Sequence, residues 1–141
     1  MKTAVKIGVC ALLCAAVATL AACVKARAEN QFYSVTGVKL PKCETVKTTD
    51  TTGWFGDGEV TYTFTFNQAN GKALEETLKS AKNWAALPMT AEFEEQTYVY
   101  YHASVPRVES GYYYYGGGNY TFTVAIYDAQ ARTVYFSGIN I

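Results

Sequence analysis

The sequence predicts an α+β fold, in which an antiparallel sheet of about four to five strands carries one or two helices on one face. Three observations support this prediction. Residues 59–66 alternate between larger and threonine side chains, residues 72–85 repeat apolar side chains at helical spacing, and residues 111–138 contain successive strand-like runs separated by turns. A strand, a helix and a further series of strands favour helices packed on an antiparallel sheet.

The first 28 residues differ in composition from the rest of the chain. Lys2 and Lys6 precede an uncharged, mostly apolar run over residues 7–24, whereas every aromatic residue (2 Trp, 12 Tyr and 7 Phe) lies from Phe32 onward. A short basic start, an apolar stretch and small residues at its end are typical of a secretory signal peptide. We therefore expect a signal peptide over residues 1–22.

The end of this segment offers two processing sites. The sequence LAAC at residues 20–23 resembles a bacterial lipobox, in which the cysteine thiol receives a diacylglycerol and becomes the new N-terminus. Lipidation of Cys23 would make residues 23–31 a lipid-anchored tether at the extracytoplasmic side of the cell membrane. The alternatives are cleavage after Ala28, which would release a secreted protein, and an uncleaved membrane helix.

Charge excludes one class of partner. The chain carries 12 basic and 12 acidic side chains, and from Cys23 onward ten basic side chains remain against 12 acidic ones. A mildly acidic domain has no basic surface to neutralise phosphates, so we expect no nucleic acid partner. It also has no polybasic patch for anionic lipids, so the expected contact with the membrane is the lipid anchor.

Residues 32–141 have the length of a single domain, and its elements are expected in a definite order. Alternation of side chains predicts strands, and apolar side chains three and four residues apart predict helices. The expected elements are a short strand at 44–48, a strand at 59–66, a helix at 72–84, and strands at 111–115, 119–128 and 132–138. Residues 89–103 fit either helix or strand, and the favoured interpretation is a helical turn capped by Thr90 that runs into a strand.

Few residues are suited to catalysis or metal binding. His102 is the only histidine, and Cys43 is the only thiol that would stay free after lipidation of Cys23. These two side chains cannot form a zinc shell, and nothing near Cys43 in the sequence would lower its pKa. We therefore expect no catalytic residue of this kind, no metal and no cofactor.

Two carboxylates stand close together in the segment GDGE at residues 56–59. A tight turn with glycines at positive φ is the favoured interpretation. An alternative is that Asp57 and Glu59, about 7 Å apart on an extended chain, act as a pair in glycoside hydrolysis. An irregular calcium site is a further alternative, although the order of an EF-hand loop is absent.

The aromatic residues are the main candidates for a ligand or partner surface. In a strand, the side chains at 112 and 114 face one way and those at 113 and 115 the other, so both faces must be covered or some rings stay exposed. Tyrosine provides a large contact area at a small entropic cost. The candidate surface residues are Trp54, Phe55, Asp57, Glu59, Tyr112, Tyr113, Tyr114 and Tyr115.

Several short motifs occur in an unusual order. They are FGDGE at 55–59, Trp84 with LP at 87–88, GYY at 111–113 and FTVAIYD at 122–128. This pattern resembles a family of small uncharacterised exported proteins and lipoproteins of Gram-positive bacteria. The resemblance implies export and a similar architecture, but no particular activity.

These observations lead to one main hypothesis about function. The chain is expected to be a membrane-anchored lipoprotein that binds an envelope protein or a glycan through an aromatic-rich surface. One alternative is a cell-envelope enzyme that acts on glycans through Asp57 and Glu59. Another is an inhibitor or immunity-type protein that covers a partner with the hairpin at residues 112–115.

Overall fold

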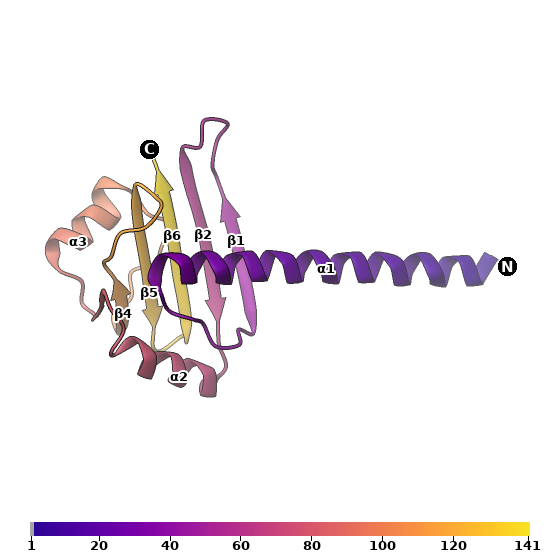
Figure 1. The fold of residues 1–141 in the computed structure, drawn as a ribbon, viewed down its shortest axis with the longest axis horizontal. Coiled ribbons are helices and arrows are strands. Elements are labelled where there is room, and N and C mark those ends of the chain that lie inside the picture. Colours follow the sequence, from indigo (N-terminus) through magenta and orange to yellow (C-terminus); the bar gives the residue numbers. More distant parts are fainter. Residues whose placement is uncertain (1) are drawn as a thin grey trace.

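The computed structural model describes the backbone of residues 2–141 and the side chains of residues 13–141. Six strands form one antiparallel sheet in the order β1-β2-β6-β5-β4-β3, with helices packed against it (Figure 1). The elements are α1 (Lys2–Thr36), β1 (Thr45–Asp50), β2 (Gly58–Thr65), α2 (Gln68–Leu78), β3 (Trp84–Ala86), α3 (Ala91–Glu95), η1 (Gln96–Tyr100), β4 (Gly111–Tyr114), β5 (Phe122–Asp128) and β6 (Thr133–Asn140). The predicted α+β class is confirmed, with six strands rather than four to five.

Pairing of β6 with β2 joins two parts of the sheet that are distant in sequence. β4, β5 and β6 pair consecutively, as predicted, and Tyr62 of β2 lies opposite Phe136 of β6. The register places Val60, Tyr62 and Phe64 on the same face, where all three are buried. The threonines between them therefore face the other side of the sheet.

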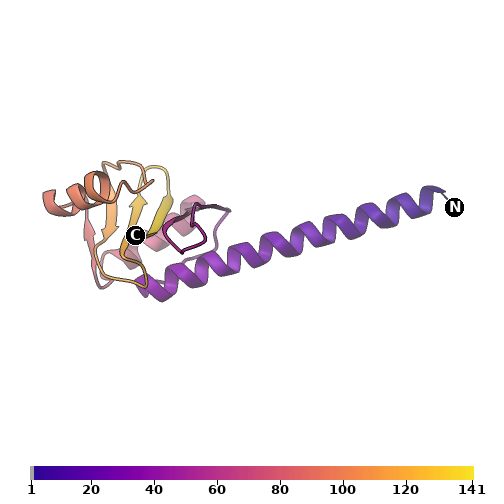
Figure 2. The ribbon, with the colours of Figure 1, turned by 90° about the horizontal axis from the view of Figure 1, so that it is seen from above.

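Helix α1 crosses the strands on one face of the sheet, and its N-terminal half extends beyond β1 (Figures 1 and 2). The helix ends at Thr36 because Gly37 takes a positive φ of 70°, and the Gly37 amide donates to the Tyr33 carbonyl at 2.8 Å. Within the part of the chain that the structure describes, we find no helix with the length and apolar composition needed to cross a membrane.

Packing of α1 on the sheet centres on Phe32, which is fully buried. Its ring lies 5.7 Å from the rings of both Phe64 and Phe136. Ala28 is also fully buried. The packed unit therefore extends to residues before Phe32, whereas the sequence predicted a tether through residue 31.

Helix α2 covers the same face through Leu74 and Leu78, which are both buried. It begins at Gln68 rather than residue 72, because the Asn67 side chain caps it by accepting a hydrogen bond from the Asn70 amide at 2.8 Å. It ends at Leu78, before the predicted end at residue 84. The segment Trp84–Ala86 instead forms β3, the strand that the sequence did not predict.

The opposite face is covered by α3 and by η1, a single π-helical turn. Thr90 caps α3 as predicted, since its hydroxyl accepts a hydrogen bond from the Phe93 amide at 3.3 Å. The strand predicted to follow is wrong. The backbone stays helical through Tyr100, and the buried Thr97 hydroxyl donates to the Phe93 carbonyl at 2.7 Å. Helices therefore lie on both faces of the sheet, not on one.

Candidate functional site

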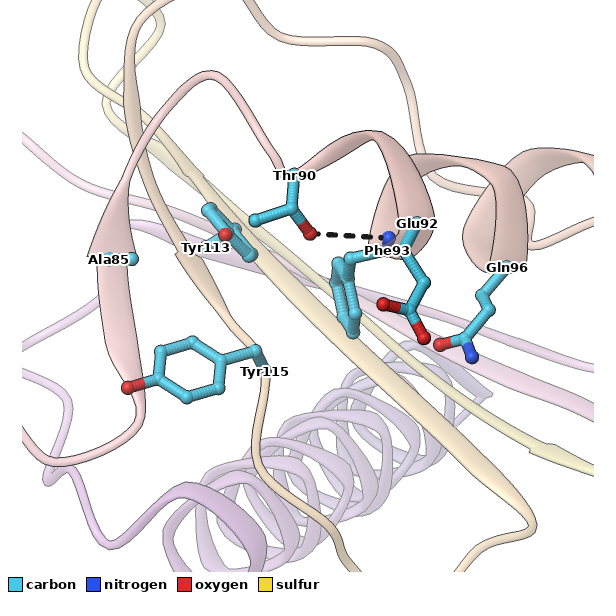
Figure 3. Close-up of a pocket in the computed structure, with 7 residues that line it drawn as sticks. All are labelled: Ala85, Thr90, Glu92, Phe93, Gln96, Tyr113 and Tyr115. Atoms are coloured by element: carbon cyan, nitrogen blue, oxygen red, sulfur yellow. Dashed lines mark hydrogen bonds between the residues drawn. The ribbon is translucent and has the colours of Figure 1, made fainter.

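A cavity of about 450 Å³ opens between α3 and the strands β3 and β4, on the face opposite α1 (Figure 3). It combines aromatic rings with a carboxylate, an amide and hydroxyl groups. Its lining residues are Ala85, Thr90, Glu92, Phe93, Gln96, Tyr113 and Tyr115. A volume of this size is typical of sites for small ligands.

The aromatic part of the cavity follows from strand pairing and helix capping. Ala85 of β3 lies opposite Tyr113 of β4, and the small alanine side chain leaves space beside the ring. The Thr90 cap begins α3 so that Phe93 faces Tyr113, with the ring centroids 5.3 Å apart. The ring of Tyr115 lies 6.1 Å from that of Tyr113 and extends the aromatic surface outward.

The polar part of the cavity comes from Glu92 and Gln96, which are four residues apart in α3 and η1. Such spacing places two side chains on the same side of a helix, and Figure 3 shows the carboxylate and the amide side by side at the cavity. Among the described side chains, no ion-pair partner within 4.0 Å is found for Glu92, and no lysine or arginine lines the cavity. The site therefore suits a neutral or cationic ligand better than an anion.

A second hollow of about 480 Å³ lies next to this cavity and shares Glu92 and Gln96 with it. Its other lining residues are Glu95, Val99, Tyr100 and Tyr101. Val99 and Tyr100 are exposed. The Tyr101 ring stacks on Phe122, with centroids 4.3 Å apart. Aromatic and apolar surface is therefore present on both sides of the Glu92–Gln96 pair.

The four tyrosines of residues 112–115 divide between the two faces, as the alternation predicts. Tyr114 is 3% exposed, and its hydroxyl lies 2.9 Å from the carbonyl oxygens of both Val35 and Gly117, which share its one hydrogen as acceptors. Tyr112 packs against the same core. Tyr113 is 4% exposed and Tyr115 is 51% exposed, and these two line the cavity. The four tyrosines therefore form no continuous exposed patch. Most of the aromatic surface that they expose belongs to Tyr115.

Trp54, Phe55 and Asp57 lie apart from the cavity, in the turn between β1 and β2. That hairpin occupies one edge of the sheet, and β3 and β4 are at the other edge. The structure thus does not bring together the two groups of predicted aromatic residues.

Glu59 is held by internal hydrogen bonds. Its carboxylate accepts from the Ser104 amide at 2.8 Å and from the Ser104 hydroxyl at 2.6 Å, and the Ser137 hydroxyl also donates to it. These bonds connect β2, β6 and the segment that follows η1. Glu59 therefore has a structural role, because its carboxylate oxygens already accept these hydrogen bonds.

Cys43 is not placed for nucleophilic chemistry. Cys43 is buried, and burial raises the pKa of its thiol to about 12, with the nearby Glu29 carboxylate acting in the same direction. A thiol with such a pKa stays protonated at neutral pH and is a poor nucleophile. His102 follows η1 in a left-handed conformation with a φ of 51°. Among the described residues, no cluster of three or more potential metal ligands is present.

Sequence reasoning missed Ala85, Thr90, Glu92, Phe93 and Gln96 as site residues. Thr90 was recognised as a cap, and the helical turn after it could have indicated that Glu92 and Gln96 share one side. No local pattern reveals that α3 packs beside β4, because that contact depends on the position of β3.

No family model matches the chain, and comparisons with curated proteins and with solved structures find no match.

Proposed function

We propose that the chain is a membrane-anchored extracytoplasmic binding module that holds a sugar unit of a cell-envelope glycan in the cavity between α3 and β4. The observation that carries this proposal is the combination of Tyr113, Tyr115 and Phe93 with the Glu92–Gln96 pair. Aromatic rings contact the apolar faces of a sugar, while a carboxylate and an amide accept and donate hydrogen bonds to its hydroxyls.

Binding rather than catalysis is supported by the state of the candidate carboxylates. The Glu59 oxygens are occupied by Ser104 and Ser137, and Asp57 lies at the distant hairpin. Hydrolysis of a glycosidic bond needs two carboxyl groups that flank the bond. The cavity residues include a single carboxylate, that of Glu92.

Anchoring through Cys23 is supported by the position of α1. Cys23 is exposed, whereas Ala28 is fully buried against the sheet. Processing at Cys23 keeps Ala28 in the core. Cleavage after Ala28 would remove it and leave only residues 29–36 of the helix to support Phe32.

The proposed binding is tested by titrating the full chain with a soluble β-1,4-linked N-acetylglucosamine oligomer in a calorimeter. We expect Tyr115→Ala and Glu92→Gln each to weaken binding roughly tenfold, equivalent to about 1.4 kcal/mol. The matched control is Tyr33→Ala, which removes an exposed tyrosine from α1. Equal affinities for the wild type and both cavity variants, or an equal loss in the control, would contradict the proposal.

A further inference from the structure

The turn between β1 and β2 presents two adjacent aromatic side chains to solvent. Trp54 is 103% exposed and Phe55 is 98% exposed. Large aromatic residues usually bury most of their surface, so two neighbours without a packing partner indicate an interaction site. The two side chains project from the turn of a hairpin, a shape that suits insertion into a deformable surface.

The turn holds these rings outward through its own hydrogen bonds. The Gly53 amide donates to the Asp57 carbonyl at 2.7 Å, and the Gly56 amide donates to the Gly53 carbonyl at 3.0 Å. At the base of the turn, the Thr51 amide donates to the Glu59 carbonyl at 2.8 Å. Exposure of both rings is therefore built into the backbone, which lowers the entropic cost of a contact.

The hairpin lies on the edge of the sheet from which α1 leaves the domain (Figure 1). Contacts of α1 with the domain continue to Lys25, whose ammonium donates to the Cys43 carbonyl at 3.4 Å. Cys23 is two residues further toward the N-terminus, about 7.5 Å along the helix axis from the buried Ala28. Almost no linker would thus separate a lipid on Cys23 from the packed domain. The lipid would hold the sheet edge formed by the β1–β2 hairpin close to the bilayer.

We propose that Trp54 and Phe55 insert into the interfacial layer of the membrane and form a second contact beside the lipid anchor. The inference rests on the anchoring part of the proposed function. Tryptophan favours the membrane interface because its ring is apolar and its N–H reaches polar groups. Because the anchor raises the local concentration of the turn at the membrane surface, the two rings insert even if their own affinity for the membrane is weak.

The charges around the turn define the kind of membrane contact. Asp50 and Asp57 flank the two rings, and no lysine or arginine occurs between Lys47 and Lys72. The contact is therefore apolar rather than electrostatic. We expect it to be stronger on phosphatidylcholine vesicles than on vesicles that contain phosphatidylglycerol, and salt should not weaken it.

The test compares partition of the full chain and of the W54A/F55A variant into phosphatidylcholine vesicles, each with native Cys23 and with Cys23→Ser. We expect the double substitution to reduce partition roughly tenfold in both backgrounds. The matched control is V99A/Y100A, because it removes another adjacent exposed apolar pair, at η1. This control should partition like its parent.

Fluorescence gives an independent readout, since the chain has only two tryptophans and Trp84 is buried. Phosphatidylcholine with brominated acyl chains should quench the wild-type emission but not that of Trp54→Phe. Unchanged partition in W54A/F55A, or equal quenching of wild type and Trp54→Phe, would overturn the insertion. Protection of Trp54 only upon adding another envelope protein would overturn it in favour of protein docking.

The two proposals fail separately in this design. If Cys23→Ser has no effect while W54A/F55A still lowers partition, the anchor is wrong and the insertion stands. If the W54A/F55A substitution lowers partition more on vesicles that contain phosphatidylglycerol than on phosphatidylcholine vesicles, the prediction of an apolar contact is wrong.

Discussion

Phe32 is the residue on which attachment of α1 to the sheet most depends. Its ring contacts Phe64, Phe136 and Trp84, with centroid distances of 5.7, 5.7 and 6.2 Å. The neighbouring Gln31 adds polar contacts. Its amide oxygen accepts from the Tyr62 hydroxyl at 2.6 Å, and its amide nitrogen donates to the Tyr120 hydroxyl. Burial raises the pKa of Tyr120 to about 12, so the hydroxyl that accepts from Gln31 stays neutral further into the alkaline range than an exposed tyrosine.

Phe32→Ala should lower the free energy of unfolding by about 3–5 kcal/mol, because it removes a fully buried ring and leaves a cavity. The measurement is chemical denaturation followed by circular dichroism. Tyr33→Ala is the matched control, since Tyr33 is the next residue of the same helix and is exposed. A loss below about 1 kcal/mol for Phe32→Ala would show that α1 does not pack as described.

At the same scale, the sequence predicted some residue roles correctly and missed others for a physical reason. Alternation in residues 59–66 correctly placed Val60, Tyr62 and Phe64 on one face, because strand periodicity is local. Glu59 shows the limit of such reasoning. The serines that donate hydrogen bonds to it are 45 and 78 residues away in the sequence, and no local pattern predicts these contacts.

At the scale of elements, the end of α1 is set by a single glycine. Gly37 has a φ of 70°, in the left-handed region, and a Cβ there would meet no atom within 4 Å. Gly37→Ala should therefore destabilise the protein through backbone strain alone, by about 1 kcal/mol. Gly117→Ala is the matched control, because that position also has open space but no positive φ, and we expect no loss there. Thermal denaturation of both variants checks this, and equal melting temperatures would contradict the assignment.

Prediction of elements succeeded where local signals were strong and failed where tertiary contacts decided. The strands of residues 111–138 were expected correctly, since alternation and glycine-rich turns define them. β3 was missed because Trp84–Ala86 is too short for a pattern, and it is a strand through pairing with β4. Residues 97–100 have strand-forming side chains but stay helical. Tyr98 and the following Tyr101 pack against the buried cluster on this face of the sheet, which includes Val124 and Ile126, and this packing outweighs the strand propensity.

At the scale of the whole molecule, the proposed lipid anchor at Cys23 predicts where the protein resides. Cys23→Ser should move the protein from the membrane fraction to the extracytoplasmic fraction, because the residue that would carry the lipid is lost. Cys14→Ser is the matched control, since Cys14 is another exposed cysteine of α1. Fractionation followed by immunoblotting measures the outcome. Retention of Cys23→Ser in the membrane fraction, equal to that of Cys14→Ser, would contradict lipid anchoring.

The place of β6 between β2 and β5 also constrains how the chain folds. The hairpins β1–β2 and β4–β5 each pair residues that are near in sequence, but the two halves of the sheet meet only through β6. Tyr62, for instance, pairs with Phe136, which lies 74 positions later in the chain. Such long-range pairing slows folding, since a large loop must close first. A chain that emerges gradually therefore stays without a completed sheet until residues 133–140 arrive.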